Sequence, residues 1–266
     1  WNIGANDVAN AMGTSVGSHA LTIKQAVIVA AIFEFGGAFL VGGSVTSTIR
    51  KGIISIEIFH TPTQLALAMT AALLAAALWL QVASLKGLPV STTHSIVGAV
   101  IGAGIVHAGL DAVQWTKIGT IVASWFVSPV CGGLLAFMVF SWIRKNILDQ
   151  EDPEKKTHQL APPLVFFAGT ILMMTFIYKG LKNLKLDLSF EVTTAMAAGV
   201  GLILALMARF WIKRTQSPGA DRDSRIQYVE RVFAWLQIIT ACFMAFAHGS
   251  NDVANAIGPA AAVYSA

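Results

Sequence analysis

Residues 4–13 read GANDVANAMG and residues 249–258 read GSNDVANAIG, so eight of ten positions are identical across a spacing of 245 residues. A ten-residue repeat at one large spacing indicates that the chain contains two related halves. Each copy holds one aspartate and two asparagines between small residues. The role of these polar side chains depends on the solvent around them, which the composition indicates.

The charge distribution places most of the chain in a lipid bilayer. Only 12% of the 266 residues are charged and 55% are hydrophobic, whereas soluble domains carry about 25% charged residues. Soluble enzymes, nucleic-acid-binding domains and disordered tails are therefore excluded. A helix needs roughly 20 apolar residues to cross the hydrocarbon core, so we expect an all-α polytopic membrane protein. Asp, Glu, Lys and Arg are absent from residues 58–85, 87–110, 118–143, 157–178, 192–208 and 232–251.

Basic residues gather in two polar loops, 144–160 and 213–231, which the positive-inside rule places in the cytoplasm. If each apolar segment crosses once, the two motif copies run in opposite directions, which is the inverted-repeat plan of many secondary transporters with broken or re-entrant helices. A re-entrant segment at 89–108 would reverse this orientation. The eight apolar segments are residues 1–22, 25–49, 62–85, 89–108, 117–143, 161–179, 189–212 and 232–266.

Three regions follow from this plan. We expect residues 1–143 to form the first repeat and residues 144–231 to supply connecting membrane helices and cytoplasmic loops. Residues 232–266 would begin a second, truncated repeat. The sequence is accordingly expected to be a fragment of a longer transporter, cut at both ends.

The two motif copies carry the chemistry that most needs explaining. An ionised carboxylate inside a bilayer costs at least a few kcal/mol and persists only beside a partner or a water-filled cavity, so Asp7 and Asp252 indicate a site. Their oxygen atoms and those of nearby amides suit sodium, and protons would suit the carboxylates equally. The alternative is that the amides are hydrogen-bond partners between packed helices. Helical spacing places two asparagines beside each carboxylate, Asn6 and Asn10 in the first copy and Asn251 and Asn255 in the second.

A second cluster, PVSTTHS at residues 89–95, predicts a helix start at membrane depth. Free N–H groups and the positive end of the helix dipole bind anions there, so Ser91, Thr92 and Thr93 would hold phosphate or sulfate. The alternative is an ordinary capped helix at the membrane surface. His94 is either a structural hydrogen-bonding residue or a proton carrier.

Glu34 is the single charge within residues 25–49, and a lone intramembrane glutamate is a functional candidate for cation coupling or gating. The alternative is a residue that snorkels to the membrane surface or lines the wall of a pore. Enzyme activity is not expected, because the glycines at 98–104 follow no predicted strand and no nucleophile motif has a plausible base.

The doubled motif, together with Pro89-Val90-Ser91-Thr92-Thr93-His94 and the region around Glu34, resembles the inorganic phosphate transporter family. This family contains phosphate permeases related to the eukaryotic sodium-phosphate symporters. The resemblance covers most of the chain. It implies inverted repeats that meet at a central site, with phosphate bound there and sodium ions beside it.

The resemblance also implies roles for particular residues. Phosphate ligands would be Ser91, Thr92, Thr93, Asn6, Asn251, Asp7 and Asp252, and sodium ligands would be Asp7, Asn10, Asp252 and Asn255. Coupling or gating would involve Glu34 and His94.

The function we expect is import of inorganic phosphate by cation symport, with sodium as the co-transported ion and no cofactor. The expected location is multi-pass, in a plasma or bacterial inner membrane. Alternatives are proton-coupled phosphate transport, a sulfate permease of the same fold, and a membrane sensor that does not transport. Expected partners are inorganic phosphate, sodium or protons and the bilayer, with no nucleic acid and with a homodimer as an open alternative.

Overall fold

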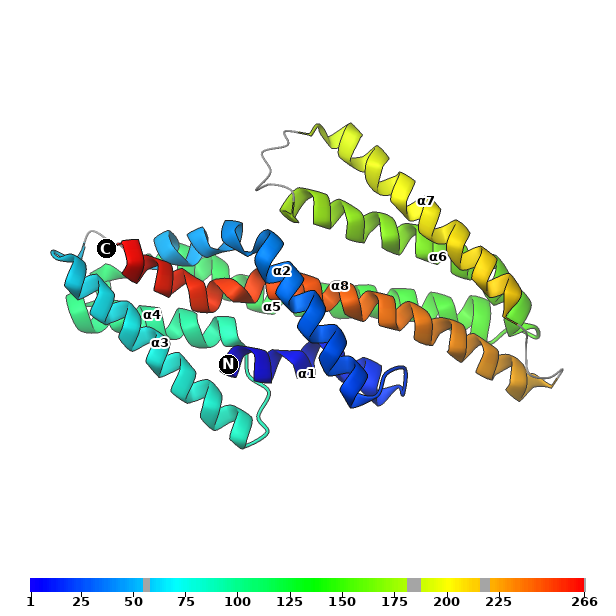
Figure 1. Cartoon of the computed structure of the whole chain (residues 1–266), viewed down its shortest axis with the longest axis horizontal. Helices are drawn as coiled ribbons and strands as arrows, with labels where there is room; N and C mark the ends of the chain where they lie inside the picture. The colour runs from blue at the N-terminus through cyan, green and yellow to red at the C-terminus, as the bar shows by residue number, and fades with distance from the viewer. Residues whose placement is uncertain (55–57, 181–187, 216–220, 266) are drawn as a thin grey trace. The chain divides into compact units, whose positions relative to one another are not determined.

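A computed structural model describes residues 1–54, 58–180, 188–215 and 221–265. The described residues form helices joined by short turns, with one isolated bridge between Ile54 and Val113 and no strand (Figure 1). The helices are α1 (Asn2–Gly17), α2 (Ile23–Gly52), α3 (Pro62–Leu85), α4 (Thr92–Ala108), η2 (Leu110–Ala112), α5 (Trp115–Ile143), η3 (Arg144–Leu148), α6 (Pro153–Thr175), η4 (Phe176–Gly180), α7 (Phe190–Arg214) and α8 (Arg222–Ser265).

Six of the described helices are long and apolar enough to cross a membrane: α2, α3, α5, α6, α7 and α8. The predicted all-α polytopic membrane fold is therefore confirmed. Helix α4 has 17 residues. At 1.5 Å per residue it is about 26 Å long, shorter than the ~30 Å hydrocarbon core. Such a length is that expected of a broken or re-entrant helix.

Two of the predicted loops are wrong, because helices occupy much of them. Helix α6 begins at Pro153 and α8 begins at Arg222, within the stretches 144–160 and 213–231 that the sequence predicts as loops. Asp152 caps α6 by accepting the N–H of Lys155 at 3.1 Å. Hydropathy marks where apolar side chains end, whereas helical backbone hydrogen bonds continue into the polar region.

Packing divides the chain into two compact units, residues 1–124 with 241–266 and residues 125–240. These units are defined by contacts and not by internal similarity, so the predicted repeat boundaries stay a prediction. In the first unit, α1, α2 and α8 share a core of small side chains and one methionine. This core consists of Ala11, Met12, Ala26, Ala30, Ala241 and Ala245.

Glycines allow α2 and α8 to approach closely within the first unit. A Cβ atom on Gly37 would collide with the carbonyl oxygen of Phe246, and one on Gly249 would collide with the carbonyl oxygen of Glu34. Small residues at a crossing of this kind are the usual means of packing membrane helices, since backbones then touch directly. The crossing fixes the height of Glu34 on α2 relative to the motif on α8.

The neighbouring glycines Gly36 and Gly37 provide a matched test of this crossing. Gly37→Ala is expected to destabilise the protein by about 1–3 kcal/mol, because overpacking forces the two backbones apart. Gly36→Ala places its Cβ 3.9 Å from the Phe246 ring, an ordinary contact, and should not destabilise. Thermal unfolding of the two variants in detergent measures the difference, and equal midpoints would contradict the close crossing.

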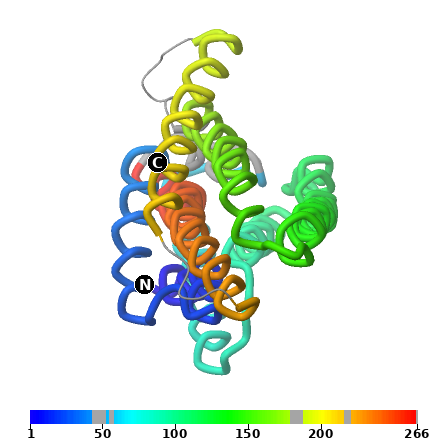
Figure 2. The backbone as a smooth tube through the Cα atoms, turned by 90° about the vertical axis from the view of Figure 1, so that its right-hand side faces the viewer, coloured from blue at the N-terminus to red at the C-terminus, as the bar shows by residue number. Residues whose placement is uncertain are grey.

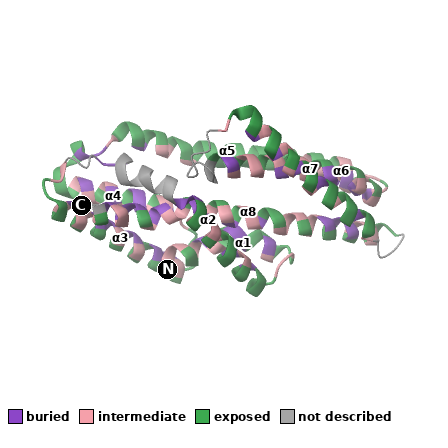
Figure 3. Cartoon of the chain, turned by 45° about the horizontal axis from the view of Figure 1, so that its top comes forward, coloured by how far each residue is buried: buried purple, intermediate pink, exposed green. Residues whose placement is uncertain are grey.

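In the second unit, α6 and α7 lie side by side (Figures 1 and 2). Their contact also passes through glycines, since a Cβ on Gly201 would collide with Thr170 and with the Phe166 carbonyl. Among the described residues of α5, Ile118 alone is buried, and Figure 3 shows this helix exposed over most of its length. An apolar helix with so much exposed surface suits lipid as its solvent.

Tyr228 joins α6, α7 and α8 in the second unit. Its side chain is 0% exposed, and its hydroxyl donates to the Ile212 carbonyl at 3.1 Å. The same hydroxyl lies 3.1 Å from Nε2 of His158. A phenol has a single hydrogen, so Nε2 of His158 must be the donor in that second bond.

Tyr228→Phe is expected to destabilise the protein by about 1–3 kcal/mol, because the buried partners of the lost hydroxyl are left with one hydrogen bond fewer. The measurement is the thermal midpoint in detergent. Tyr178→Phe is the control, since Tyr178 is 43% exposed. Indistinguishable midpoints for the two variants would show that Tyr228 does not hold these helices together.

Candidate functional site

Four helices of the first unit bring polar side chains together. Helix α1 contributes Asp7, α2 contributes Glu34, the start of α4 contributes Thr92 and Thr93, and α8 contributes His248, Asp252 and Asn255.

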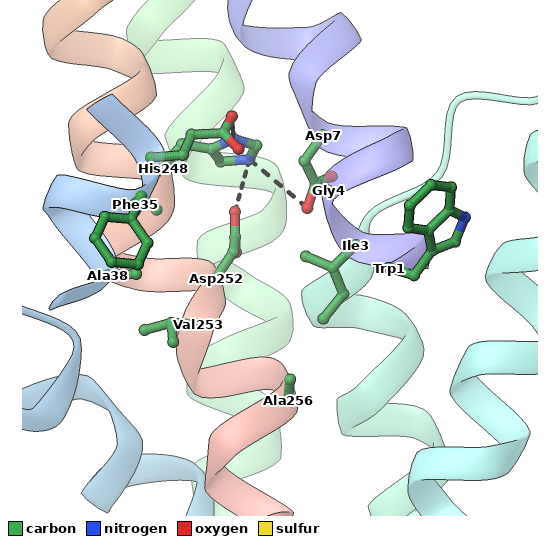
Figure 4. A pocket seen from close by; sticks show the side chains of 12 residues that line it. Trp1, Ile3, Gly4, Asp7, Phe35, Ala38, His248, Asp252, Val253 and Ala256 are labelled. Carbon is green, nitrogen blue, oxygen red and sulfur yellow. Dashed lines mark ion pairs between the residues drawn. The ribbon is translucent and has the colours of Figure 1, made fainter. Parts of the chain in front are cut away.

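His248 lies at the centre of the acidic side chains (Figure 4). Its Nε2 lies 2.6 Å from Oδ2 of Asp252 and 3.9 Å from Oδ2 of Asp7. Its Nδ1 lies 3.5 Å from Oε1 of Glu34. The imidazole therefore links carboxylates from α1, α2 and α8, including one from each motif copy.

The two ring nitrogens of His248 face carboxyl groups from different helices. A neutral imidazole can donate to one of these groups, and an imidazolium can donate to two. The cluster contains three carboxyl groups and one imidazole, so acidic groups outnumber basic ones. Such a cluster suits a cation.

Asn255 connects the second motif copy to the start of α4. Its Nδ2 lies 3.2 Å from Oγ1 of Thr92, 3.1 Å from Oγ1 of Thr93 and 3.0 Å from Oδ1 of Asp252. The amide has two hydrogens, so two of these three acceptors share one of them. The threonines in turn donate to the two carboxylates, Thr92 to Asp7 at 3.0 Å and Thr93 to Asp252 at 3.4 Å. Asp7 and Asp252 are thus tied together by hydroxyls and an amide as well as by the imidazole.

The start of α4 has the geometry that the PVSTTHS cluster predicts. Ser91 is the cap, and its Oγ accepts the N–H of His94 at 3.3 Å. The Ser91 and His94 side chains are exposed, Thr92 is buried and Thr93 is partly buried. Hydroxyls and the N–H groups of the first turn therefore lie beside the acidic cluster, at the positive end of the α4 dipole.

A cavity of about 270 Å³ opens on the same carboxylates. Figure 4 shows Asp7, His248 and Asp252 on its polar side, with Trp1, Ile3 and Phe35 among its apolar residues. The volume is well above the ~10–15 Å³ that a single water requires. A partly hydrated small ion fits such a space.

Three side chains offer ligand atoms for a cation. The nearest ligand atoms of Asp7, His248 and Asp252 all lie within 4.8 Å of one another. The carboxylate oxygens suit a hard cation, whereas the imidazole would become a ligand only after losing a proton. Asn6, next to Asp7 in the sequence, has a buried Oδ1 without a hydrogen-bond partner among the described residues.

The structure gathers some of the residues that the sequence predicts and leaves others apart. Asp7, Asp252, Thr92, Thr93, Asn255 and Glu34 lie in the cluster. Asn6 is partly buried beside Asp7 in sequence, while Asn10 and Asn251 have exposed side chains in this arrangement. Their predicted roles as sodium and phosphate ligands stay predictions.

Sequence reasoning missed the central residue, His248. The signal was present, because His248 and Asp252 are four residues apart and so share one face of a helix. Comparing the motif copies shows that Ile3 occupies the matching position in the first copy, so the two halves differ there and the repeat assigns His248 no role. The repeat draws attention to what the two halves share, and His248 belongs to one of them.

Comparison with known proteins identifies relatives over the full chain. The model of the phosphate transporter family matches residues 3–266. A Haemophilus influenzae protein named "Putative phosphate permease" is 46% identical over 100% of this chain and 63% of its own length. The chloroplastic inorganic phosphate transporter 2-1 of Arabidopsis thaliana is 40% identical over 100% of this chain and 48% of its own length.

A solved structure described as a sodium-dependent phosphate transporter is also similar. The two structures superpose with a TM-score of 0.89, and their sequences are 38% identical. The match covers 99% of this chain and 64% of the chain of the solved structure. The chain spans 63 to 66% of the length of three of its microbial relatives. With six helices able to cross a membrane, the chain is a multi-pass membrane protein, and it belongs to the phosphate transporter family.

Proposed function

We propose that the intact protein imports inorganic phosphate together with sodium. The observation that carries this proposal is the convergence of Asp7 and Asp252, one from each motif copy, on the hydroxyls at the start of α4. Cation-binding oxygens and an anion-binding helix start lie side by side there. The family and the sodium-dependent relative of known structure support the same reading.

Charge explains why the two ions would move together. Phosphate carries a charge near −2 and is costly to place in a site of low dielectric. The excess negative charge of the Asp7, Asp252 and Glu34 cluster raises this cost, so phosphate alone is repelled. Cations bound to the carboxylates remove the repulsion, and the N–H groups of α4 can then hold the anion.

Uptake of radiolabelled phosphate by proteoliposomes that contain the intact protein tests the proposal. An inward sodium gradient is expected to drive accumulation, and replacing sodium by potassium should abolish it. Uptake that is independent of sodium and is abolished by a protonophore would instead indicate proton coupling. An excess of sulfate that competes fully with phosphate would indicate a less selective anion permease.

A membrane sensor that does not transport is the remaining alternative. Asp7→Asn should strongly reduce uptake if Asp7 binds a co-transported cation, and uptake at the wild-type rate with normal expression would favour the sensor. The proposal involves no chemical reaction and no cofactor, and the homodimer stays a prediction. Light scattering of the purified protein measures its oligomeric state.

A further inference from the structure

The hydroxyl hydrogens of Thr92 and Thr93 are both committed to carboxylates. A hydroxyl has one hydrogen and two acceptor lone pairs, and an ionised carboxylate only accepts. The contacts to Asp7 and Asp252, at 3.0 and 3.4 Å, must therefore use the threonine hydrogens. One lone pair on each hydroxyl accepts from Asn255. Neither threonine has a hydrogen left to donate to an anion in this arrangement.

The two hydroxyls differ in how easily their hydrogens can be released. Thr92 is 3% exposed and its bond to Asp7 is 3.0 Å long. Thr93 is partly buried and its bond to Asp252 is 3.4 Å long, beyond the usual 2.5–3.0 Å for two oxygens and therefore weak. Thr93 is the hydroxyl that can change partner at low cost.

We propose that Thr93 couples cation binding to phosphate binding by turning its hydroxyl; this inference rests on the proposed function. A cation bound at Asp252 repels the hydroxyl hydrogen and attracts the second lone pair of Oγ1. Rotation about the Cβ–Oγ1 bond then turns the hydrogen away from Asp252, where a phosphate oxygen accepts it. No covalent bond changes, and the bond from Asn255 is kept.

After this rotation every hydrogen-bonding capacity of the Thr93 hydroxyl is used. One lone pair faces the cation, the other accepts from Asn255, and the hydrogen is donated to phosphate. Asn255 is the positioning residue, because its Nδ2 holds Oγ1 in place at 3.1 Å while the hydrogen swings. The cation-free protein instead keeps the hydrogen on Asp252, so cation binding precedes phosphate binding.

A hydrogen bond that exists only when both ions are bound makes their affinities interdependent. By linkage, sodium must raise phosphate affinity by the same factor as phosphate raises sodium affinity. Neutralisation of charge by sodium contributes to this factor whatever Thr93 does. The Thr93 contribution is separable because it is absent from the sodium-free protein.

The test measures binding of radiolabelled phosphate to the purified intact protein by equilibrium dialysis, with sodium and with potassium in its place. Thr93→Val is expected to weaken phosphate binding in sodium by about tenfold or more, as for loss of a hydrogen bond to a charged group. In potassium the variant should bind phosphate within about twofold of wild type. Sodium titrations with and without phosphate should show the same loss of coupling.

Two variants control this measurement. Thr93→Ser keeps a rotating hydroxyl and should retain the sodium effect. Thr194→Val removes a threonine hydroxyl of α7 that bonds to the Phe190 carbonyl of its own helix at 2.8 Å, and it should leave both affinities unchanged. Where Thr93→Val fails to fold, Thr93→Ala removes the same hydroxyl without the branched side chain.

The outcomes separate this inference from the proposed function. Equal weakening in sodium and potassium would make Thr93 a plain phosphate ligand and overturn the switch. An unaltered sodium effect in Thr93→Val would also overturn it, with sodium symport left intact. If phosphate binds to the wild-type protein with the same affinity in sodium and in potassium, the proposed function and the inference are both overturned.

Discussion

Sodium-driven phosphate uptake is expected to fall at least about 100-fold when Asp252 is replaced by asparagine in the intact protein. Asp252 accepts from His248 at 2.6 Å and also from Thr93 and Asn255. Asparagine keeps the shape and removes the charge, so the ion pair with His248 is lost. A 100-fold loss of rate corresponds to about 2.7 kcal/mol, because each 1.36 kcal/mol is tenfold. The substitution also removes a carboxylate that the proposed function assigns to cation binding.

Initial rates of radiolabelled phosphate uptake in proteoliposomes measure this effect, with the amount of inserted protein determined in parallel. The control is Asp223→Asn, which removes a carboxylate from the first turn of the same helix, where the side chain is exposed. Its uptake should remain near the wild-type rate. If the initial uptake rate of Asp252→Asn stays within about threefold of the wild-type rate, the acidic cluster has no essential part in transport.

Replacing His248 with leucine is expected to cause the largest loss of stability in the first unit. The substitution leaves Asp7, Glu34 and Asp252 without the imidazole that lies between them. Uncompensated buried charge costs about 3–5 kcal/mol, so the thermal midpoint in detergent should fall clearly. Phosphate uptake should be lost as well, because the carboxylates no longer hold their positions.

A double-mutant cycle distinguishes this charge effect from a packing effect. When Asp252→Asn is added to His248→Leu, one of the repelling charges is gone, so the combined loss of stability should be about 0.5–3 kcal/mol smaller than the sum of the two single losses. His60→Leu is the matched control, since His60 is exposed. Strict additivity would show that His248 contributes by shape and not by charge.

Much of the membrane fold could be predicted from the sequence, because lipid imposes a simple rule on composition. Each of the eight apolar segments coincides with one helix, and the segment predicted at 62–85 matches α3 at both ends. A proline after Thr61 supplies the local start signal there. The start of α8 was predicted ten residues late, since Arg222 to Arg231 is helical and polar.

The candidate site was predictable only in part. A carboxylate within an apolar segment identifies Asp7 and Asp252 as residues that require partners, whatever the fold. Their partners depend on how α1, α2, α4 and α8 cross. The spacing of residues in the sequence does not predict these crossings. The placement of His248 between both carboxylates, and the exposure of Asn10 and Asn251, follow from those crossings.

The sequence by itself determined that this is a helical membrane protein and that its two acidic motifs are related. These properties depend on the local chemistry of each segment and on the bilayer that surrounds it. The tertiary structure alone decided that Thr93 and Asn255 join Asp252 to the start of α4. Hydrogen bonds act over about 3 Å. Thr93 and Asp252 are 159 positions apart in the sequence, and only helix packing brings their side chains within that range.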